Sequence, residues 1–463
     1  MAQSHYTYPK APPLANTPRA PQRGVMAWRR TSTHHHTRNT VRLIHTSDWH
    51  LGHKLHNQSR HDEHVAFLDW LVEQIVTHDV DALLIAGDVF DTPNPPAESV
   101  KLLYDFFHKL HSTSPRLQTV IIGGNHDSAQ RLEAPQLILS ALNIHIIGAL
   151  YPQEPLDLDR TLIPLTNKRG ERAAWVVAIP YLRPSDLPNL TPRPENHLVE
   201  GVREVYRLAL ERVSARRGAG EGVVVMGHCF MVSGTVSEDS ERRILGNHQH
   251  ALPLDLFPMD VSYVALGHLH YAQALKGVEK IRYAGSPIPL SLTERNYKHQ
   301  VALVELEDEG SGAGPRGSFK SVTPLYIPRL VEMIRIPEAG GVSSEEALKA
   351  LSDLPERDES VPLWRRPFLH VCVHLSSPDP QLKAKVFEVL KGKHARLSRL
   401  QVTMTTGTSR PEERLQTLHL SEIKEVDVFK RLWERKYDAP LPDEALEAFQ
   451  VLLNEVLESE GEA

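Results

Sequence analysis

The stretch Leu43-Ile44-His45-Thr46-Ser47-Asp48-Trp49-His50 is the most informative part of the sequence. Apolar and β-favouring residues lead into Asp48 and His50, which are two positions apart. If the chain stays extended there, these two side chains lie on one side of the strand end, and Trp49 points to the other. A carboxylate beside an imidazole suits a borderline or hard divalent cation better than a soft one. The stretch therefore predicts one corner of a metal site.

Four further polar motifs follow short apolar runs, at the points where strands would end. They are Gly87-Asp88, Gly124-Asn125-His126-Asp127, Gly227-His228 and Gly267-His268-Leu269-His270. Ligands of α/β folds collect at the carboxyl ends of the strands, so we expect these side chains to converge. The glycines leave space for the backbone to approach a metal ion or a phosphate. One Asp-x-His pair alone is weak evidence for a metal site. The prediction depends on the recurrence of polar motifs at five expected strand ends.

The composition is that of an ordinary soluble globular protein with room for two to four domains. Of the 463 residues, 41% are hydrophobic and 24% are charged. No apolar run approaches the 18 residues of a membrane span. The two cysteines, Cys229 and Cys372, are far apart, which argues against a disulfide framework or a thiolate metal site and fits a cytoplasmic location. The net charge of −6 gives no global attraction to nucleic acid, so DNA binding would need a local basic surface.

Residues 1–39 differ from the rest of the chain. They contain no acidic residue and five prolines, and such a segment cannot bury a core. We expect a disordered arm. An alternative is that translation begins at Met26.

From residue 40 onward, apolar runs that resemble buried strands alternate with amphipathic helices. The first four runs are Val41–Thr46, Ala82–Ala86, Thr119–Ile122 and Ile144–Ile147. Later runs are Ala174–Ile179, Val223–Met226, Tyr263–Leu266 and Ile281–Ala284, with a helix expected over Leu198–Arg217 and a closing hairpin over Val301–Leu306 and Ser321–Ile327. This alternation predicts an α/β fold with a largely parallel sheet over residues 40–328.

The last third of the chain changes in character. Residues 329–410 alternate strand and helix over a short length, which predicts a small α+β domain. Residues 411–463 are charged and helical, broken at Pro440 and Pro442. The sequence has no GxxxxGK[ST] motif, which excludes ATP binding through a P-loop.

Taken together, the five polar motifs resemble those of the calcineurin-like metallophosphoesterases, in the same order along the chain. Within that superfamily, four blocks resemble the nuclease subunits of bacterial SbcCD complexes. These are His45–Gly52, Asp88–Asp91, Gly123–Ser128 and Tyr283–Pro287. The resemblance is good over residues 41–300 and weaker beyond. It implies a metallophosphoesterase sandwich of mixed and parallel sheets flanked by helices, with a small α+β capping domain and a C-terminal helical segment.

The resemblance also implies a two-metal site. Two divalent ions about 4 Å apart can clamp the attacking and leaving oxygens of a phosphodiester. By resemblance, Asp88 bridges the ions. Asp48, His50 and His270 would complete one site, and Asn125, His228 and His268 the other. The expected metal is Mn²⁺, with Mg²⁺ possible.

His126 has a different implied role, that of a general acid on the leaving oxygen. Asp91 would orient it through its other ring nitrogen. The alternative is that His126 merely hydrogen-bonds its loop. We expect His53, His56, His61 and His64 to be solvated residues at a helix entry.

The implied function is that of a metal-dependent DNA nuclease that cuts duplex ends and single strands or hairpins, in DNA repair, replication and recombination. Its implied partners are DNA and an SbcC-type coiled-coil ATPase, in a heterotetramer containing two copies of this chain. Residues 329–410 would bind DNA and 411–463 would dock on the ATPase. Basic residues that could approach DNA are Arg242, Arg243, Lys391, Lys393, His394, Arg396 and Arg399, although charge runs are usually just solvated.

Two other classes of function stay open from the sequence alone. One is a small-molecule phosphodiesterase or protein phosphatase of the same superfamily, because metal ligands do not separate these from nucleases. The other is a non-catalytic tethering subunit, against which the intact ligand set argues.

Overall fold

The computed structural model describes residues 40–151, 156–192, 194, 196–232, 234–235, 251–307 and 317–404, with a few residues between 426 and 450. The predicted disordered arm (1–39), the Arg242-Arg243 pair and most of the predicted docking segment (411–463) lie outside the described residues. The chain divides into two compact units. One is Met1–Met333 with Val361–Arg366, and the other is Ile334–Ser360 with Pro367–Ala463.

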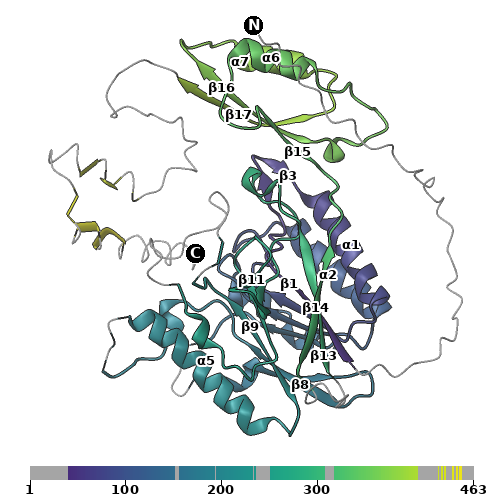
Figure 1. Ribbon diagram of the computed structural model, residues 1–463, viewed down its shortest axis with the longest axis vertical. Helices are drawn as coiled ribbons and strands as arrows, with labels where there is room; N and C mark the ends of the chain where they lie inside the picture. The colour runs from purple at the N-terminus through teal and green to yellow at the C-terminus, as the bar shows by residue number, and fades with distance from the viewer. Residues whose placement is uncertain are drawn as a thin grey trace, which may run out of the picture. The chain divides into compact units, whose positions relative to one another are not determined.

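The first unit contains two six-stranded mixed sheets (Figure 1). The first sheet has the order β14-β13-β1-β4-β5-β6. Its strands are β1 (Thr40–Thr46), β4 (Ala82–Ala86), β5 (Gln118–Ile122), β6 (Ile144–Ile147), β13 (Gln300–Glu307) and β14 (Phe319–Tyr326). The four strands from β1 to β6 run parallel, and the late β13-β14 hairpin adds antiparallel strands beside β1.

The second sheet has the order β11-β12-β10-β9-β8-β7. Its strands are β7 (Leu162–Thr166), β8 (Arg172–Ala178), β9 (Gly222–His228), β10 (Tyr263–Gly267), β11 (Gln273–Leu275) and β12 (Val278–Tyr283). The four central strands are parallel, and the edge strands β7 and β11 are antiparallel to their neighbours.

Successive side chains of each strand point alternately to its helices and to the other sheet. The result is a sandwich of four layers, with helices outside two central sheets. In β1, Ile44 faces the core under α1 (His61–Thr77) and α2 (Ala97–Thr113), and the neighbouring Leu43 faces the other sheet. The second sheet is covered on its outer face by α5 (His197–Arg216), as Figure 1 shows. Burial on both faces explains why these strands read as continuous apolar runs. The predicted sandwich of mixed and parallel sheets flanked by helices is confirmed.

Short elements fill the connections of the first unit. A small hairpin, β2 (Lys54–Leu55) and β3 (Gln58–Ser59), precedes α1, and the helices α3 (Ala129–Glu133) and α4 (Gln136–Ser140) follow the Asn125-His126 loop. None of the described helices combines the length and apolar character that a bilayer crossing requires.

The second unit is a three-stranded sheet with two helices. Its elements are β15 (Met333–Ile336), α6 (Ser344–Ser352), β16 (Phe368–Leu375), α7 (Leu382–Leu390) and β17 (Arg396–Met404). α6 begins at a capping box in which Ser343 and Glu346 satisfy each other's free backbone amides. The helices pack on one face of the sheet through Leu351, Val371 and Val386.

Small residues let the two sheets of the first unit approach at one end. A Cβ atom on Gly267, at the end of β10, would lie 1.9 Å from the carbonyl oxygen of Ala86, at the end of β4. A Cβ atom on Gly87 would lie 2.2 Å from Nδ1 of His228. These glycines leave space for the opposite strand and for the His228 ring, and so bring the carboxyl ends of both sheets together.

Candidate metal centre

The polar motifs converge at these carboxyl ends. Three groups, each of three His and Asp residues, place ligand atoms within 4.8 Å of one another. The first group is Asp48, His50 and His270, and the second is Asp88, His228 and His268. A third group, His50, Asp91 and His126, shares His50 with the first. The six residues of the first two groups are buried. The structure therefore brings together all six charged or imidazole residues predicted as ligands, from both sheets.

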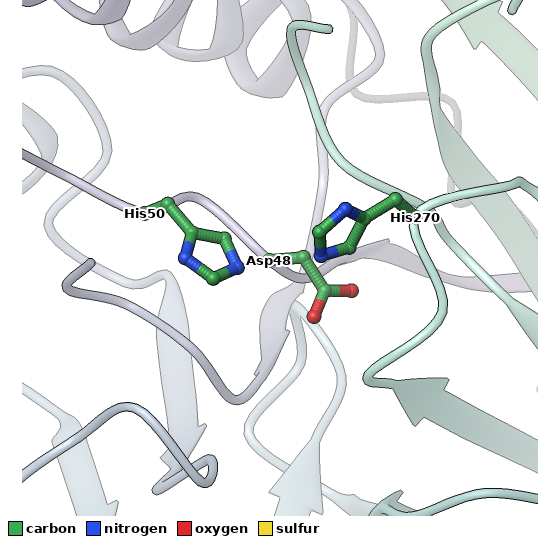
Figure 2. A group of neighbouring side chains, drawn as sticks. All are labelled: Asp48, His50 and His270. Carbon is green, nitrogen blue, oxygen red and sulfur yellow. The ribbon is translucent and has the colours of Figure 1, made fainter. Parts of the chain in front are cut away.

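In the first group, the two imidazole rings flank the Asp48 carboxylate (Figure 2). Oδ1 of Asp48 accepts a hydrogen bond of 2.9 Å from the backbone amide of His268, which belongs to the second sheet. Nδ1 of His270 lies 3.0 Å from the Glu294 carboxylate. The first group is thus assembled from both sheets, and its ring and carboxylate orientations are set by surrounding groups.

In the second group, two imidazole rings face the amide oxygen of Asn125. This Oδ1 lies 3.1 Å from Nε2 of His228 and 3.0 Å from Nδ1 of His268. Nδ1 of His228 is 2.8 Å from the carbonyl of Ala86, so this nitrogen carries the proton and Nε2 is left to face the group. Asn125, also predicted as a ligand, therefore joins the second group.

Asp88, a member of the second group, also faces His50 of the first group. Its Oδ2 is 3.3 Å from Nε2 of His228 and 3.6 Å from Nε2 of His50. Its Oδ1 accepts a 2.8 Å hydrogen bond from the backbone amide of His126. This is the position that a carboxylate shared between two cations requires.

These residues fit a pair of divalent cations. Among the described residues, neither ring nitrogen of the buried His50 has a well-aligned hydrogen bond, although carboxylate oxygens of Asp91 and Asp88 lie 3.3 Å and 3.6 Å from them. A buried imidazole without partners is costly unless something else satisfies it. Carboxylate, amide oxygen and imidazole donors also match the preference of Mn²⁺ or Mg²⁺ over soft metals. The assignment of individual ligands stays a prediction, developed below.

The buried acids and imidazoles perturb one another. Burial lowers the pKa of His228, but the Asp88 carboxylate outweighs it and raises that pKa to about 9. Burial, reinforced by the charge of His228, lowers the pKa of His268 to about 3. The pKa values of the two imidazoles in the second group are thus shifted in opposite directions. Positive charge is favoured on the His228 ring, beside the Asp88 carboxylate.

The backbone at the centre is not extended, which corrects our expectation for Asp48 and His50. β1 ends at Thr46, and both residues have left-handed backbone, with φ of 53° and 47°. Asp88 (φ 49°) and His268 (φ 102°) do the same. The geometry of an extended strand end does not apply, because the chain turns at each position. Trp49 does point away, into the core against Phe67 and Phe106.

The same correction applies to His268 and His270. We expected both from one extended strand end, but β10 ends at Gly267 and the turn at His268 sends the two rings to different groups. Left-handed backbone costs a non-glycine residue about 1–3 kcal/mol, and such residues cluster at functional sites. Four ligand positions with this backbone mark the centre as a functional site.

His126 lies beside the first group. Its ring packs edge-on against His50, with ring centres 4.7 Å apart. Its Nδ1 lies 2.8 Å from the main-chain carbonyl of Asp91. Asp91 therefore contacts the other ring nitrogen of His126, as expected, but through its backbone. The Asp91 carboxylate instead lies 3.0 Å from Nδ1 of His53 and 3.3 Å from Nδ1 of His50.

Two histidines expected in solvent are not there. His64 is fully buried, and its Nε2 lies 2.9 Å from the carbonyl of Trp49. His53 is half-buried between Asp91 and the carbonyl of Leu290. The prediction was wrong for both, because these residues hold the turn after β1 rather than the outer face of a helix.

Sequence reasoning also missed two carboxylates. Glu294 is completely buried, and besides His270 it accepts a 2.8 Å hydrogen bond from the Leu290 amide. Asp127 accepts hydrogen bonds from the amides of Val89, Phe90 and Gly124, tying two site loops together. No motif marks Glu294, which follows the site in an irregular segment. Asp127 stands inside a motif and gave no separate signal.

The fold and the paired ligand groups define a calcineurin-like phosphoesterase, and residues 41–272 match the family model of that description. The SbcD component of the nuclease SbcCD from Rhodobacter capsulatus is 40% identical over 375 residues, covering 80% of this chain and 89% of that protein. The chain belongs to this family, the SbcD proteins of SbcCD nucleases.

Other relatives carry the same name. The Escherichia coli K12 protein is 35% identical over 296 residues, 62% of this chain and 68% of that protein. The Bacillus subtilis protein is 29% identical over 411 residues, 88% of this chain and 96% of that protein. Residues 329–437 match a second model, described as the type 5 capsule protein repressor C-terminal domain.

Proposed function

We propose that this protein is the metal-dependent DNA nuclease subunit of an SbcCD-type complex, with exonuclease activity on duplex ends and endonuclease activity on single strands and hairpins. One observation carries the proposal: at the carboxyl ends of two sheets, Asp88 faces an imidazole of each of two buried groups of metal-ligand type. Family membership adds the substrate class. DNA repair, replication and recombination are the processes that such cutting serves.

Each predicted ligand receives a place in the centre. Asp48, His50 and His270 hold one cation, Asn125, His228 and His268 the other, and Asp88 both. We propose Mn²⁺, with Mg²⁺ as a substitute. When bound, the cation pair supplies Lewis-acid polarisation of the phosphodiester and an activated water.

His126 serves as the general acid. The Asp91 carbonyl fixes the proton on Nδ1, so in the charged ring Nε2 holds the second proton, which goes to the leaving oxygen. Edge-on packing against His50 keeps this ring beside the first group. Asp91 acts as a positioning residue, through its carbonyl on His126 and its carboxylate on His50.

Residues 329–410 form a capping domain that binds DNA. Part of the predicted basic patch is unsuited to this. Lys391 lies 2.6 Å from Glu388, and Lys393 lies 2.7 Å from Glu356 and also donates to two backbone carbonyls. Arg399 is exposed on β17 and is the better candidate for a phosphate contact.

The assembly is a heterotetramer of two copies of this chain and two copies of a coiled-coil ATPase, in the cytoplasm. Residues 411–463 dock on the ATPase. Two large apolar side chains on α4 support self-association: Leu137 is 88% exposed and Ile138 72% exposed.

The decisive experiment compares cleavage of a DNA hairpin with hydrolysis of a small aryl phosphodiester, with and without Mn²⁺. A nuclease cuts the hairpin in a Mn²⁺-dependent manner. Hydrolysis of the aryl ester alone would instead indicate a small-molecule phosphodiesterase or a phosphatase. A chain inert on both substrates would be a tethering subunit.

A further inference from the structure

An apolar cavity opens beside the second ligand group. Its volume is about 90 Å³, several times what one water requires. It lies between the loop after β8, the N-terminal half of α5 and the segment after β9. We call it the Tyr181 pocket. The rings of Tyr181 and Phe230, the aliphatic side chains of Leu182, Val199 and Val202, and His228 all line it.

His228 connects this pocket to the metal centre. The same imidazole belongs to the second ligand group and to the pocket wall. The ring of Tyr181 meets it edge-on, with ring centres 6.3 Å apart and an interplanar angle of 84°. The backbone amide of Tyr181 donates a 2.8 Å hydrogen bond to the carbonyl of Gly123, next to the loop that carries Asn125 and His126. Tyr181 is therefore fixed relative to the reacting groups.

The residues that line the pocket indicate the chemical class of ligand that it can bind. None of the described residues that line it is Asp, Glu, Lys or Arg. The one imidazole in the wall, His228, also belongs to the second ligand group. A phosphate would find a counter-charge at that end of the pocket alone, whereas a flat, uncharged ring would find aromatic and aliphatic walls. A larger cavity of about 470 Å³, around Pro287 and Arg329, shares no residue with the ligand groups and gives no such link.

We propose that the Tyr181 pocket receives the base of the nucleotide whose phosphate lies at the metal centre. The inference rests on the proposed function and adds a nucleobase subsite to it. Stacking of a base on an aromatic side chain is tolerant of sequence, because every base has a flat face. Such a subsite suits an enzyme that must process any sequence, and it requires the base to leave the duplex stack.

The test measures what a base contributes to binding. Calorimetry on the full chain with Mn²⁺ compares deoxyadenosine 5′- and 3′-monophosphates with deoxyribose 5-phosphate, which lacks a base. We expect at least one mononucleotide to bind about 10- to 100-fold more tightly than the sugar phosphate, the range that stacking supplies. The ratio of these affinities is the readout in every variant.

Two variants alter the Tyr181 pocket at different walls. Tyr181→Ala removes the ring, and Val202→Trp fills the cavity from α5. Both should bring the ratio close to one, and two independent positions keep the test valid if one variant misfolds. Tyr104→Ala, which removes a partly exposed ring from α2, is the control and should keep the ratio of the unmodified chain.

The outcomes separate this inference from the function on which it rests. A ratio near one in the unmodified chain, or a ratio unchanged in both pocket variants, overturns the Tyr181 pocket and leaves the nuclease proposal standing. A chain that binds neither the nucleotides nor the sugar phosphate with Mn²⁺ contradicts the nuclease proposal itself.

Discussion

The Asp88 carboxylate faces one imidazole from each group, with Oδ2 3.3 Å from His228 and 3.6 Å from His50. Asp88→Asn keeps the shape but removes the shared negative charge that offsets repulsion between two cations. We expect metal content to fall from two ions per chain to none. Elemental analysis of the dialysed protein measures this.

The control for that variant is Asp69→Asn, which changes a 56% exposed carboxylate paired with Lys109. It should retain both ions. Two ions still bound in Asp88→Asn would contradict the assignment of Asp88 as the bridge.

A substitution of His126 distinguishes a general acid from a metal ligand. His126→Gln should lower turnover about 10²–10⁴-fold, the usual range for a lost general acid. Both metal ions should stay, because His126 is not among the residues proposed to hold them; its ring forms a group only with His50 and Asp91. The measurement is kcat on a DNA hairpin together with metal content. His108→Gln, on the exposed side of α2, should change neither quantity. Loss of metal along with activity would place His126 among the ligands.

Glu294 gives a prediction about metal affinity. Its buried carboxylate lies 3.0 Å from Nδ1 of His270, so it holds the proton on that nitrogen and Nε2 becomes the nitrogen that can bind a cation. Glu294→Gln should weaken Mn²⁺ binding about 10- to 100-fold, the usual range for such outer partners. Calorimetric titration with Mn²⁺ measures this. Glu279→Gln, at a 67% exposed side chain, is the matched control. Unchanged affinity in Glu294→Gln would reduce this residue to a packing role.

At the scale of elements, apolar runs predicted the buried strands well. β4 and β6 have the expected bounds, because a strand buried on both faces is a continuous apolar run. The edge strands β7 and β11 were missed. β7 contains Pro164 and β11 has only three residues, so neither gives a clear periodic signal.

The convergence of the proposed site residues was predicted from the sequence, but their backbone geometry was not. Motifs at strand ends indicated which residues converge, since parallel strands end at one edge. They did not indicate left-handed backbone at Asp48, His50, Asp88 and His268, because tertiary contacts impose it. They also gave no sign of Glu294, whose burial depends on a late irregular segment that returns to His270.

The junction between β4 and β10 offers a test of how the elements meet. Gly267→Ala adds a Cβ atom 1.9 Å from the Ala86 carbonyl, a backbone atom that cannot rotate away. We expect the two sheets to be pushed apart at the site, with a lower melting temperature and weaker Mn²⁺ binding. Gly218→Ala meets only the flexible Glu221 carboxylate, at 3.2 Å, and should have little effect. A Gly267→Ala protein with the melting temperature of the unmodified chain would show that the two sheets can move apart there at no cost in stability.

At the scale of the whole molecule, catalysis and assembly should be separable. Both ligand groups lie before residue 271, and the segment proposed to dock on the ATPase begins at 411. A truncation ending near residue 412 should keep Mn²⁺-dependent hydrolysis of a small phosphodiester. It should lose co-purification with the ATPase and ATP-dependent cutting of duplex ends. Full capture of the ATPase by the truncated chain would place the docking site elsewhere.

The hydrogen bond from the His268 amide to Asp48 joins residues 220 positions apart. Of the six residues in the two groups, Asp48, His50 and Asp88 come early in the chain, and His228, His268 and His270 come late. A chain that has emerged only as far as β6 therefore carries two of the three residues of the first group and one of the three residues of the second. Neither group is complete before His270 has been made, so a nascent or prematurely ended chain cannot form the metal centre.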